Sequence, residues 1–573
     1  RSSWEDYDRQ LISAGGGVYP RSAKSIEISP EVKAALGIAA DALTPAELIS
    51  ALLKSPVDLI YNGGIGTYVK ASTESHAEVG DRANDEVRVN GRELHCKVFV
   101  EGGNLGCTQR GRIEYARTQG RINTDAIDNS GGVDCSDHEV NIKILLGAAI
   151  ASGRLTLEQR NAQLAAMTDD VAALVLRDNY FQTQLLSVSG RISPQLLDEQ
   201  ERFIRYLERD RRLNRALEFL PTDQEFAELR RARQGLTSPE RAVLLAYAKI
   251  WLEEELLASI LPDDPWVASV LQRYFPPALA ERYAVEIATH PLRREIVATY
   301  VTNSMLNRVG STFVHRLMEA TGAPAAQVVR AYLLAREVFG MVPLWNALDA
   351  KDVTVADEDH ALILFEVNRL LERGAAWFLR SRRLGDDMAA TIACFAPGVD
   401  SLARALPALL DNGDRLRIDE ELLRLTARGV HPELAARIVV LDALFAALDI
   451  IEEANVAERP VETVARVYFA LGAKLDLPWL HERITQLPVD GHWQVLARAA
   501  LEDDLAARQR ALARMALAAG RTAPAPRLVA SWLEVNGQGI ARLGRLVGEL
   551  RSTAAPDAAM LSVALGELRG LTG

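Results

Sequence analysis

The chain has 573 residues and a formal net charge of −12, with 48% hydrophobic and 25% charged residues. This composition is typical of a soluble globular protein, and the length predicts roughly three or four domains. The acidic balance argues against a nucleic-acid partner, because binding to phosphates requires a basic surface.

The cysteines and histidines give no sign of a metal or disulfide framework. The cysteines show no CxxC spacing, which argues against disulfides and against a zinc site. The histidines are scattered, so nothing in the sequence argues for a required metal. We find neither a signal-peptide pattern nor an apolar run long enough to span a bilayer. We therefore expect a cytoplasmic protein without a membrane partner.

Three strand-like segments near the start of the chain each run into a turn rich in Gly and Asn. The pairs of strand and turn are 57–61 with 62–67, 97–100 with 101–104, and 121–127 with 129–136. Ligands bind outside the carboxyl ends of parallel strands, and glycine lets the backbone approach a ligand closely. The alternative is three ordinary tight turns, since Asn and Gly are common turn residues. The ordered set of three favours a cofactor site.

The strand-rich region lacks the element that normally begins a dinucleotide-binding domain. That element is a strand followed by G-x-G-x-x-G and a helix, and neither the glycines of 15–17 nor those of 63–66 fit it. We therefore expect the chain to begin inside a nucleotide-binding domain, after its phosphate loop. Asn90 and Gly91 further predict a β-hairpin.

Helical patterns replace strand patterns from Ser136 onward. Ser136 and Glu139 fit a capping box, which predicts a helix with Ser136 at its N-cap. We therefore expect two regions, a strand-containing domain over residues 1–150 and an α-helical domain over residues 151–573.

Two features within the helical region locate individual helices. Thr237 and Glu240 predict a helix start, with the Pro239 between them tolerated in the first turn. The apolar face predicted for this helix consists of Val243, Tyr247, Ile250 and Trp251. The dipeptide 290–291, His-Pro, is expected to interrupt a later helix.

Several short sequence motifs of this chain occur together in a known protein family. Residues 101–104 read Glu-Gly-Gly-Asn, and residues 129–133 read Asn-Ser-Gly-Gly-Val, with Ser136 three residues later. The first turn begins the word Asn-Gly-Gly-Ile-Gly-Thr-Tyr-Val-Lys over residues 62–70. In these words and their order, the chain resembles the large multidomain NAD-specific glutamate dehydrogenases of bacteria. The resemblance is dense over residues 1–150 and thinner, but continuous, beyond them.

The resemblance implies a C-terminal portion of such an enzyme. It implies the remaining part of a Rossmann-like α/β nucleotide-binding domain followed by a large all-α helical domain. The implied reaction converts L-glutamate, NAD and water to 2-oxoglutarate, ammonia and NADH. The catalytic lysine and aspartate are then expected in the upstream part of the same polypeptide, so no catalytic residue is assigned here and this chain alone is expected to be inactive. A homo-oligomer is also expected.

The resemblance also assigns contacts to NAD. Asn129 would bond to the nicotinamide carboxamide, whose donor and acceptor atoms an Asn side chain can match. Asn104 would bond near the nicotinamide ribose. Gly63 and Gly64 would let the cofactor pass over the end of the preceding strand, and Thr67 stands where ordinary members of the family have Asn.

Ser136 has two interpretations. By resemblance, its hydroxyl binds the distal carboxylate of glutamate. From the sequence alone it caps a helix, which stabilises by about 1 kcal/mol, and a helix N-terminus also offers N–H groups to an anion. The neighbouring residues Asp134, Cys135 and Asp137 depart from the ordinary hexameric pattern, which puts a direct transfer of pocket details in doubt.

A group of arginines follows the second Gly/Asn turn and could approach the cofactor pyrophosphate. We interpret it instead as a solvated helix face, which is the more common role of such a charge run. These residues are Arg110, Arg112, Arg117 and Arg121.

Two other functions stay open. The helical region could be a non-catalytic scaffold that brings subunits together. The enzyme could also act on leucine or phenylalanine, although Ser136 suits a substrate with an acidic side chain better. In each case we expect helices beyond residue 150 to pack back on the strands, because a parallel sheet needs a cover on both faces.

Overall fold

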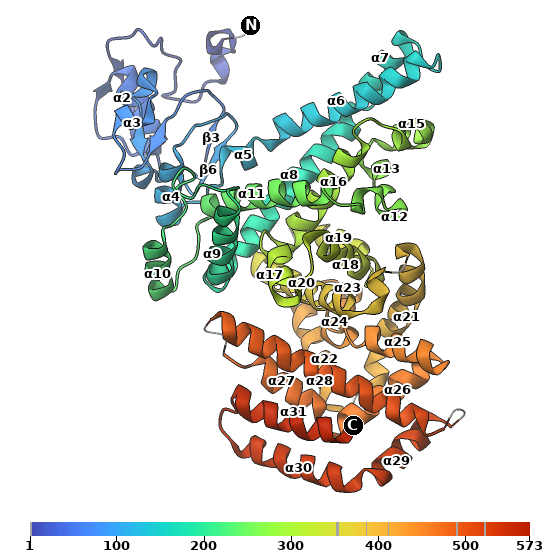
Figure 1. The fold of residues 1–573 in the computed structure, drawn as a ribbon. Coiled ribbons are helices and arrows are strands. Elements are labelled where there is room, and N and C mark those ends of the chain that lie inside the picture. Colours follow the sequence, from blue (N-terminus) through green and yellow to red (C-terminus); the bar gives the residue numbers. More distant parts are fainter. Residues whose placement is uncertain are drawn as a thin grey trace. The chain divides into compact units, whose positions relative to one another are not determined.

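The computed structural model describes residues 3–350, 355–385, 387–410, 412–488, 491–520 and 523–572. Helices dominate the fold, and the chain divides into two compact units, Arg1–Thr312 (unit 1) and Phe313–Gly573 (unit 2) (Figure 1). The predicted large helical region is therefore confirmed. The expected domain boundary near residue 150 falls within unit 1, at the end of helix α6 (Ser130–Ala151).

The strands of the described residues lie early in unit 1. They are β1 (Ile26–Glu27), β2 (Ala42–Leu43), β3 (Leu59–Asn62), β4 (Val69–Lys70), β5 (Val89–Asn90) and β6 (Val98–Glu101). β3 and β6 pair in parallel with Asn62 opposite Glu101, and Val98 makes a further parallel bridge to Arg121. β4 and β5 are also parallel, whereas β1 and β2 are antiparallel. The first two predicted strands are thereby confirmed, with small shifts in their bounds.

An apolar core joins these short strands to helix α4 (Gln109–Arg117). Its buried members include Val69, Val89, Phe99, Cys107 and Tyr115. The Tyr115 hydroxyl donates to the backbone oxygen of Cys96, which satisfies the polar end of a buried ring. The helices before α4 are short: α1 (Pro30–Leu36), α2 (Pro45–Leu53) and α3 (His76–Val79).

The predicted hairpin at Asn90 and Gly91 is wrong. β5 pairs in parallel with β4, and Gly91 begins a 3₁₀ turn rather than a return strand. A Cβ added at Gly91 would overlap the backbone oxygen of Gly111 in α4. Glycine is therefore needed here for the close approach of a helix, and not for a hairpin turn.

The third predicted strand, residues 121–127, is also wrong apart from the bridge at Arg121. Helix α5 (Asp125–Asp128) occupies its second half, and α6 begins directly after Asn129. Strand pairing of this segment with β6 is limited to Arg121, and α5 is held beside β6 by the side chain of Asp128, which accepts a hydrogen bond from the backbone N–H of Glu101.

The N-cap of α6 is Asn129, seven residues before the predicted N-cap, so Ser136 is not an N-cap. Its first residue, Ser130, accepts hydrogen bonds from two side chains of helix α8 (Thr168–Arg191). Asn179 Nδ2 and Gln182 Nε2 lie 2.9 and 2.7 Å from the Ser130 Oγ. These tertiary hydrogen bonds fix the start of α6, and Ser136 lies two turns inside the helix.

Helices make up the rest of unit 1. They are α7 (Leu157–Ala166), α9 (Ser193–Arg209), α10 (Asp223–Ala232), α11 (Ser238–Leu257), α12 (Pro265–Ala268), α13 (Leu271–Tyr274), α14 (Pro277–Arg282), α15 (Ala284–Ala288) and α16 (Arg293–Val309). The predicted interruption at residues 290–291 is confirmed, since it separates α15 from α16.

Helix α11 begins where the sequence predicts. Glu240 Oε2 accepts from both the backbone N–H and the hydroxyl of Thr237, as a capping box requires. The predicted apolar face is only partly right. Trp251 is buried, whereas the Ile250 side chain is 56% exposed. The face turned into the core instead carries Leu244, Leu245, Ala248, Trp251 and Leu252.

Helix α11 also packs against α4, next to the strands. Gln109 Nε2 donates to the backbone oxygen of Pro239, and Ser238 Oγ donates to Asn123 Oδ1. Arg117 lies 3.6 Å from Glu240. The expectation that helices beyond residue 150 pack back on the strand-containing segment is confirmed within unit 1.

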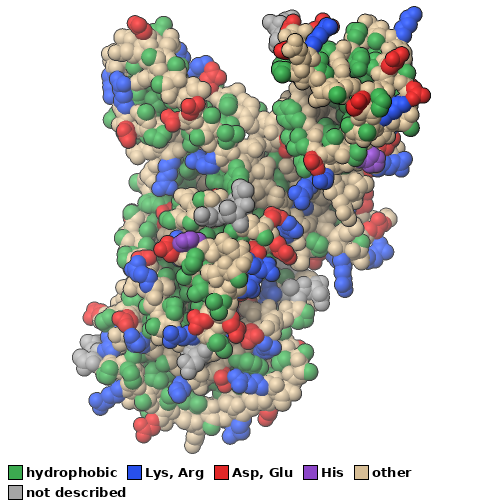
Figure 2. Space-filling view, turned by 180° about the vertical axis from the view of Figure 1, so that it is seen from behind, with side chains coloured by type: hydrophobic (Ala, Val, Ile, Leu, Met, Phe, Trp, Pro, Cys, Tyr) green, Lys and Arg blue, Asp and Glu red, His purple; other side chains and the backbone are tan. Residues whose placement is uncertain are grey.

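Unit 2 is helical throughout its described residues. Its helices are α17 (Phe313–Thr321), α18 (Ala325–Val338), α19 (Met341–Asp349), α20 (Asp357–Arg380), α21 (Met388–Leu409), α22 (Asn412–Ala427), α23 (Pro432–Ile438), α24 (Leu441–Leu444), α25 (Ala447–Ala457), α26 (Val461–Lys474), α27 (Leu477–Thr485), α28 (His492–Ala518), α29 (Ala525–Val535), α30 (Gly537–Ser552) and α31 (Ala558–Thr572). Acidic and basic side chains are interspersed on the surface that Figure 2 shows.

Helix α21 corrects the statement that the sequence holds no apolar run of membrane-spanning length. By length and composition alone, this helix could cross a bilayer. In unit 2 it packs against α18, α24, α25 and α26, and it buries Phe395, Val399, Leu402 and Leu406. Such packing is also what the core helix of a bundle shows.

Candidate functional site

The turns after β3 and β6 meet at the carboxyl edge of these two parallel strands. The backbone N–H groups of Gly102 and Gly103 both donate to the Asn62 oxygen, at 3.0 and 3.2 Å. A Cβ added at Gly103 would lie 2.5 Å from the backbone oxygen of Gly64. The two turns therefore touch through their backbones, and a side chain at Gly103 would push them apart.

Asn104 and Asn129 are brought together at this edge. Asn129 Nδ2 donates to Asn104 Oδ1 at 2.6 Å, although the two residues are 25 positions apart in the chain. Asn104 is exposed and Asn129 half-buried, so both amides border the surface. An amide pair of this kind offers a ligand both donors and acceptors.

Thr67 lies beside the same pair. Its hydroxyl donates to the backbone oxygen of Leu105 at 2.8 Å, and its backbone N–H donates to Asp81 Oδ2 at 2.8 Å. Leu105 directly follows Asn104 and has a φ of 57°, so this contact holds a left-handed turn residue. The threonine thus joins the first turn to the second, while its oxygen keeps the capacity to accept a hydrogen bond.

A buried ion pair supports the edge from below. Arg112 on α4 contacts both carboxylate oxygens of Glu101, at 2.6 and 2.9 Å, and the backbone N–H of Cys107 donates to the same carboxylate. Burial raises the pKa of Glu101, and the guanidinium of Arg112 opposes that shift. The interpretation of Arg112 as part of a solvated face is therefore wrong, because α4 turns this residue toward the strand end.

The other three arginines differ among themselves. Arg110 stacks over the Phe219 ring at 4.7 Å. Arg117 contacts Glu240 and Gln234. Arg121 is exposed.

Two aspartates that we did not single out in the sequence hold the segment before Asn129. Asp125 Oδ2 accepts from the backbone N–H of Leu105 at 2.9 Å, and Asp128 Oδ2 accepts from that of Glu101 at 3.0 Å. Burial raises the pKa of Asp128. Both aspartates belong to α5, whose four residues directly precede Asn129. This position in the sequence was the available indication that they support the site.

Ser136 lies on the same side of α6 as Asn129, two turns further on. Seven residues of helix correspond to roughly 10 Å along the axis. Ser136 is exposed, and its hydroxyl donates to the Gly132 oxygen at 3.2 Å. Because the residue is inside the helix, its surroundings offer no free helix-terminal N–H groups, and only its hydroxyl is available to a carboxylate.

Exposed apolar side chains surround these polar groups. The exposed fractions are 64% for Tyr61, 87% for Ile65, 64% for Leu105 and 66% for Val133. An apolar surface beside paired amides suits a flat ring that carries a carboxamide. None of the predicted site residues, Gly63, Gly64, Thr67, Asn104, Asn129 and Ser136, is titratable near neutral pH. They can therefore bind and orient a ligand, whereas proton transfer requires other groups.

Two family models match the chain. One, described as the catalytic domain of bacterial NAD-glutamate dehydrogenase, matches residues 1–189. The other, described as glutamate dehydrogenase, C-terminal, matches residues 233–570.

Three curated relatives carry the name NAD-specific glutamate dehydrogenase. The one from Pseudomonas aeruginosa is 47% identical over 576 residues, which cover 100% of this chain and 35% of that protein. The Halomonas elongata protein is 45% identical, with 99% and 35% covered. The Mycobacterium tuberculosis protein is 42% identical, with 100% and 36% covered. The chain thus spans about a third of the length of the curated relatives that it matches.

Proposed function

Because this chain belongs to the glutamate dehydrogenase family, we propose that it is part of an enzyme that oxidises L-glutamate with NAD. The products are 2-oxoglutarate, ammonia and NADH. The observation that carries the proposal is the meeting of Asn104 and Asn129 at the carboxyl edge of β3 and β6. This edge is where open parallel sheets bind their ligands.

The strand region is the remaining part of a Rossmann-like NAD-binding domain in this proposal, over residues 1–150. Its support is the parallel pairing of β3 with β6 and the parallel bridge from Val98 to Arg121. Three neighbouring parallel segments in this order are what such a sheet requires, and residues 151–573 form the helical domain that follows.

NAD lies across the two touching turns. Gly63 and Gly64 leave its path over the end of β3 free of side chains, and Thr67 borders that path. Asn129 bonds to the nicotinamide carboxamide, and Asn104 bonds near the ribose while it orients Asn129. Tyr61 and Leu105 supply apolar surface for the rings.

Glutamate lies further along α6, with its distal carboxylate on the Ser136 hydroxyl. Ser136 and Asn129 share one side of the helix, so one ligand-binding face can hold cofactor and substrate side by side. The catalytic lysine, the catalytic aspartate and the phosphate loop lie in the upstream part of the same polypeptide. The curated relatives, of which this chain spans about 35%, are long enough to supply it.

The test is NADH formation by the full-length protein, followed by absorbance, with L-glutamate, L-leucine and L-phenylalanine as substrates. We expect turnover with glutamate and at most trace turnover with the other two. The 573-residue chain by itself is expected to form no NADH. A preference for leucine or phenylalanine would replace the proposed substrate. A full-length protein without dehydrogenase activity would instead favour the helical-scaffold alternative.

A further inference from the structure

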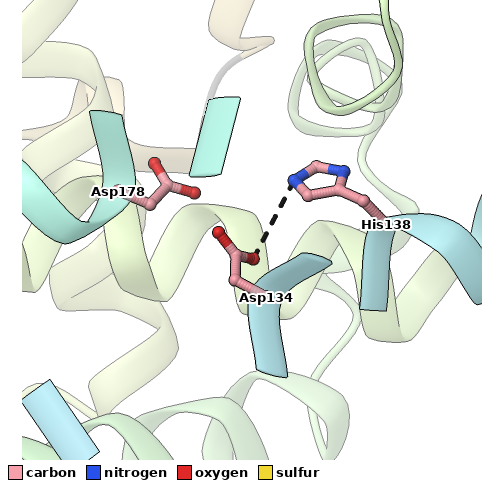
Figure 3. Close-up of side chains that lie close together, drawn as sticks. All are labelled: Asp134, His138 and Asp178. Atoms are coloured by element: carbon pink, nitrogen blue, oxygen red, sulfur yellow. Dashed lines mark ion pairs between the residues drawn. The ribbon is translucent and has the colours of Figure 1, made fainter. Parts of the chain in front are cut away.

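A second polar cluster lies on the other side of helix α6 from Ser136. Asp134 and His138 are one turn apart on α6, and Asp178 faces them from α8 (Figure 3). Asp134 and Ser136 differ by two positions, which corresponds to roughly 200° around a helix. The cluster is therefore separate from the proposed cofactor and substrate face.

The three side chains converge. Asp134 Oδ1 lies 3.9 Å from His138 Nε2, and one ligand atom from each residue lies within 4.8 Å of the others. Figure 3 shows the carboxylates of Asp134 and Asp178 and the Nε2 edge of the imidazole turned toward a common point. Helix spacing explains the first pair, because residues i and i+4 lie on one face.

The imidazole of His138 has unused binding capacity. The residue is 2% exposed and stacks on the Tyr274 ring at 4.5 Å. Among the described residues, the Nε2 of His138 lies 3.9 Å from Asp134 Oδ1, which is too far for a hydrogen bond, and its Nδ1 has no partner. Asp134 Oδ2 is likewise buried without a partner in that part of the chain. Buried polar atoms without a partner, on side chains whose ligand atoms converge, point to a missing ligand.

Three carboxylates in and beside the cluster are opposed by two cations. Asp134, Asp178 and the exposed Asp137 are opposed by Arg177, which lies 3.6 Å from Asp178, and by Lys249 on α11. Lys249 Nζ donates to Gln182 Oε1 at 3.3 Å. Burial lowers the pKa of Lys249, and the carboxylates of Asp178 and Asp134 oppose that shift.

We propose that Asp134, His138 and Asp178 bind one divalent transition-metal ion, with Zn²⁺ as the best match. One imidazole nitrogen and two carboxylate oxygens form a donor set that zinc accepts, whereas Ca²⁺ and Mg²⁺ prefer oxygen donors alone. Tetrahedral zinc with bonds near 2 Å places its ligand atoms roughly 3.3 Å apart. The observed separations, 3.9 Å between Asp134 and His138 and at most 4.8 Å within the group, exceed that value, so metal binding requires the three side chains to draw closer together.

The metal joins α6 to α8 beside the cofactor edge. Asn179, next to Asp178, donates to the backbone oxygen of Ile127 and to the Ser130 hydroxyl. Both acceptors flank Asn129 at the start of α6. A metal on Asp178 therefore holds in place the helix that presents Asn129, as metals between facing helices of a bundle do.

The test measures metal binding by the full-length protein and by three variants of it. Asp134→Asn and Asp178→Asn each remove a ligand oxygen's charge with little change in volume, and Asp137→Asn removes a charge from the exposed side of the same helix. The readouts are zinc retained after dialysis, the visible spectrum of bound Co²⁺, and the change of melting temperature on addition of ZnSO₄.

We expect one more zinc per chain in the wild type and in Asp137→Asn than in the other two variants. The dissociation constants of those two should rise by about 100-fold or more, since loss of supporting residues alone costs 10- to 100-fold. Co²⁺ should give ligand-field bands with tetrahedral intensity only where all three ligands are present. Equal zinc content and equal melting shifts in all four proteins would overturn the proposal, and Arg177 and Lys249 would then be the counterions of the cluster. Circular dichroism identifies a variant that does not fold. If Asp134→Asn or Asp178→Asn fails in this way, the zinc binding of the other one tests the proposal.

Discussion

Glu101 and Arg112 show how a buried pair can set the position of a turn, here the one that leads into the proposed cofactor contact at Asn104. Glu101 ends β6, and its carboxylate receives Arg112 from α4 and the Cys107 N–H from the turn itself. The pair thereby fixes the backbone that leads into Asn104. Burial of two charges is costly, and good geometry offsets that cost only while both partners are present.

Arg112→Met should destabilise unit 1 by about 3–5 kcal/mol, because it leaves the Glu101 carboxylate buried without its counterion. Urea unfolding of the 573-residue chain measures the change. Arg110→Met is the matched control, since Arg110 is exposed and stacks over the Phe219 ring instead of pairing with a buried carboxylate. Equal unfolding midpoints for the two variants would show that the buried pair does not support the edge.

Ser136→Ala should raise the KM for glutamate in the full-length enzyme by about 10- to 150-fold, the effect of losing a hydrogen bond to a charged group at roughly 1.5–3 kcal/mol. The melting temperature should stay nearly constant, because Ser136 does not cap α6 and its hydroxyl bonds only within the helix. Cys135→Ala, at the exposed neighbouring position, is the control for steady-state kinetics. An unchanged glutamate KM would remove Ser136 from the substrate site.

At the scale of elements, local signals located some helices and failed for others. The start of α11 was predictable because Thr237 and Glu240 satisfy each other within one turn. The start of α6 was not, because Ser130 is held by Asn179 and Gln182 from a helix about 50 residues away. The apparent capping box at Ser136 is real as a sequence pattern, but tertiary contacts override it.

Because the start of α6 was predicted wrongly, the proposed metal site of Asp134, His138 and Asp178 could not be predicted from the sequence either. With a helix that starts at Ser136, Asp134 stands outside it and shares no face with His138. With the observed start, the two residues are at i and i+4, a spacing that would have prompted the search for a third ligand. The third, Asp178, comes from α8 and has no local signal that links it to the other two.

Helix α27 of unit 2 carries a titratable residue whose environment makes the stability of the chain depend on pH. Burial lowers the pKa of His481 to about 4, although the carboxylate of Asp442 opposes that shift. The unfolded chain binds this proton below pH 6.5, and the folded chain binds it only near pH 4. The stabilisation is therefore fully present above pH 6.5 and is lost as the pH falls through that window.

The loss between neutral pH and pH 4 should reach at most roughly 3 kcal/mol. Urea unfolding of the chain at pH 7 and at lower pH values measures it, and His481→Gln should show a correspondingly weaker dependence on pH. His431→Gln is the control, because His431 is exposed. The same pH dependence in both variants would contradict the assignment to His481.

At the scale of the whole molecule, every residue assigned to NAD or glutamate lies in unit 1. The Gly/Asn turns could be located from the sequence, because two of the three follow strands with strong local patterns. That Asn104 and Asn129 touch could not be derived from local pattern, since the contact depends on Asp125 and Asp128 binding the backbone of the second turn. The family resemblance suggested what each residue binds, and the structure shows that Asn104 and Asn129 lie next to each other.

The central claim is that the carboxyl edge of β3 and β6 holds the nicotinamide of NAD through Asn129. The most direct measurement is the KM for NAD of the full-length enzyme carrying Asn129→Asp, which keeps the shape of the side chain but replaces its donor by a carboxylate. Asn161→Asp, an exposed position on α7, is the matched control. We predict that Asn129→Asp raises the NAD KM by about 10-fold or more, or roughly 1.4 kcal/mol, with a near-normal glutamate KM. An NAD KM equal to that of Asn161→Asp would contradict the account.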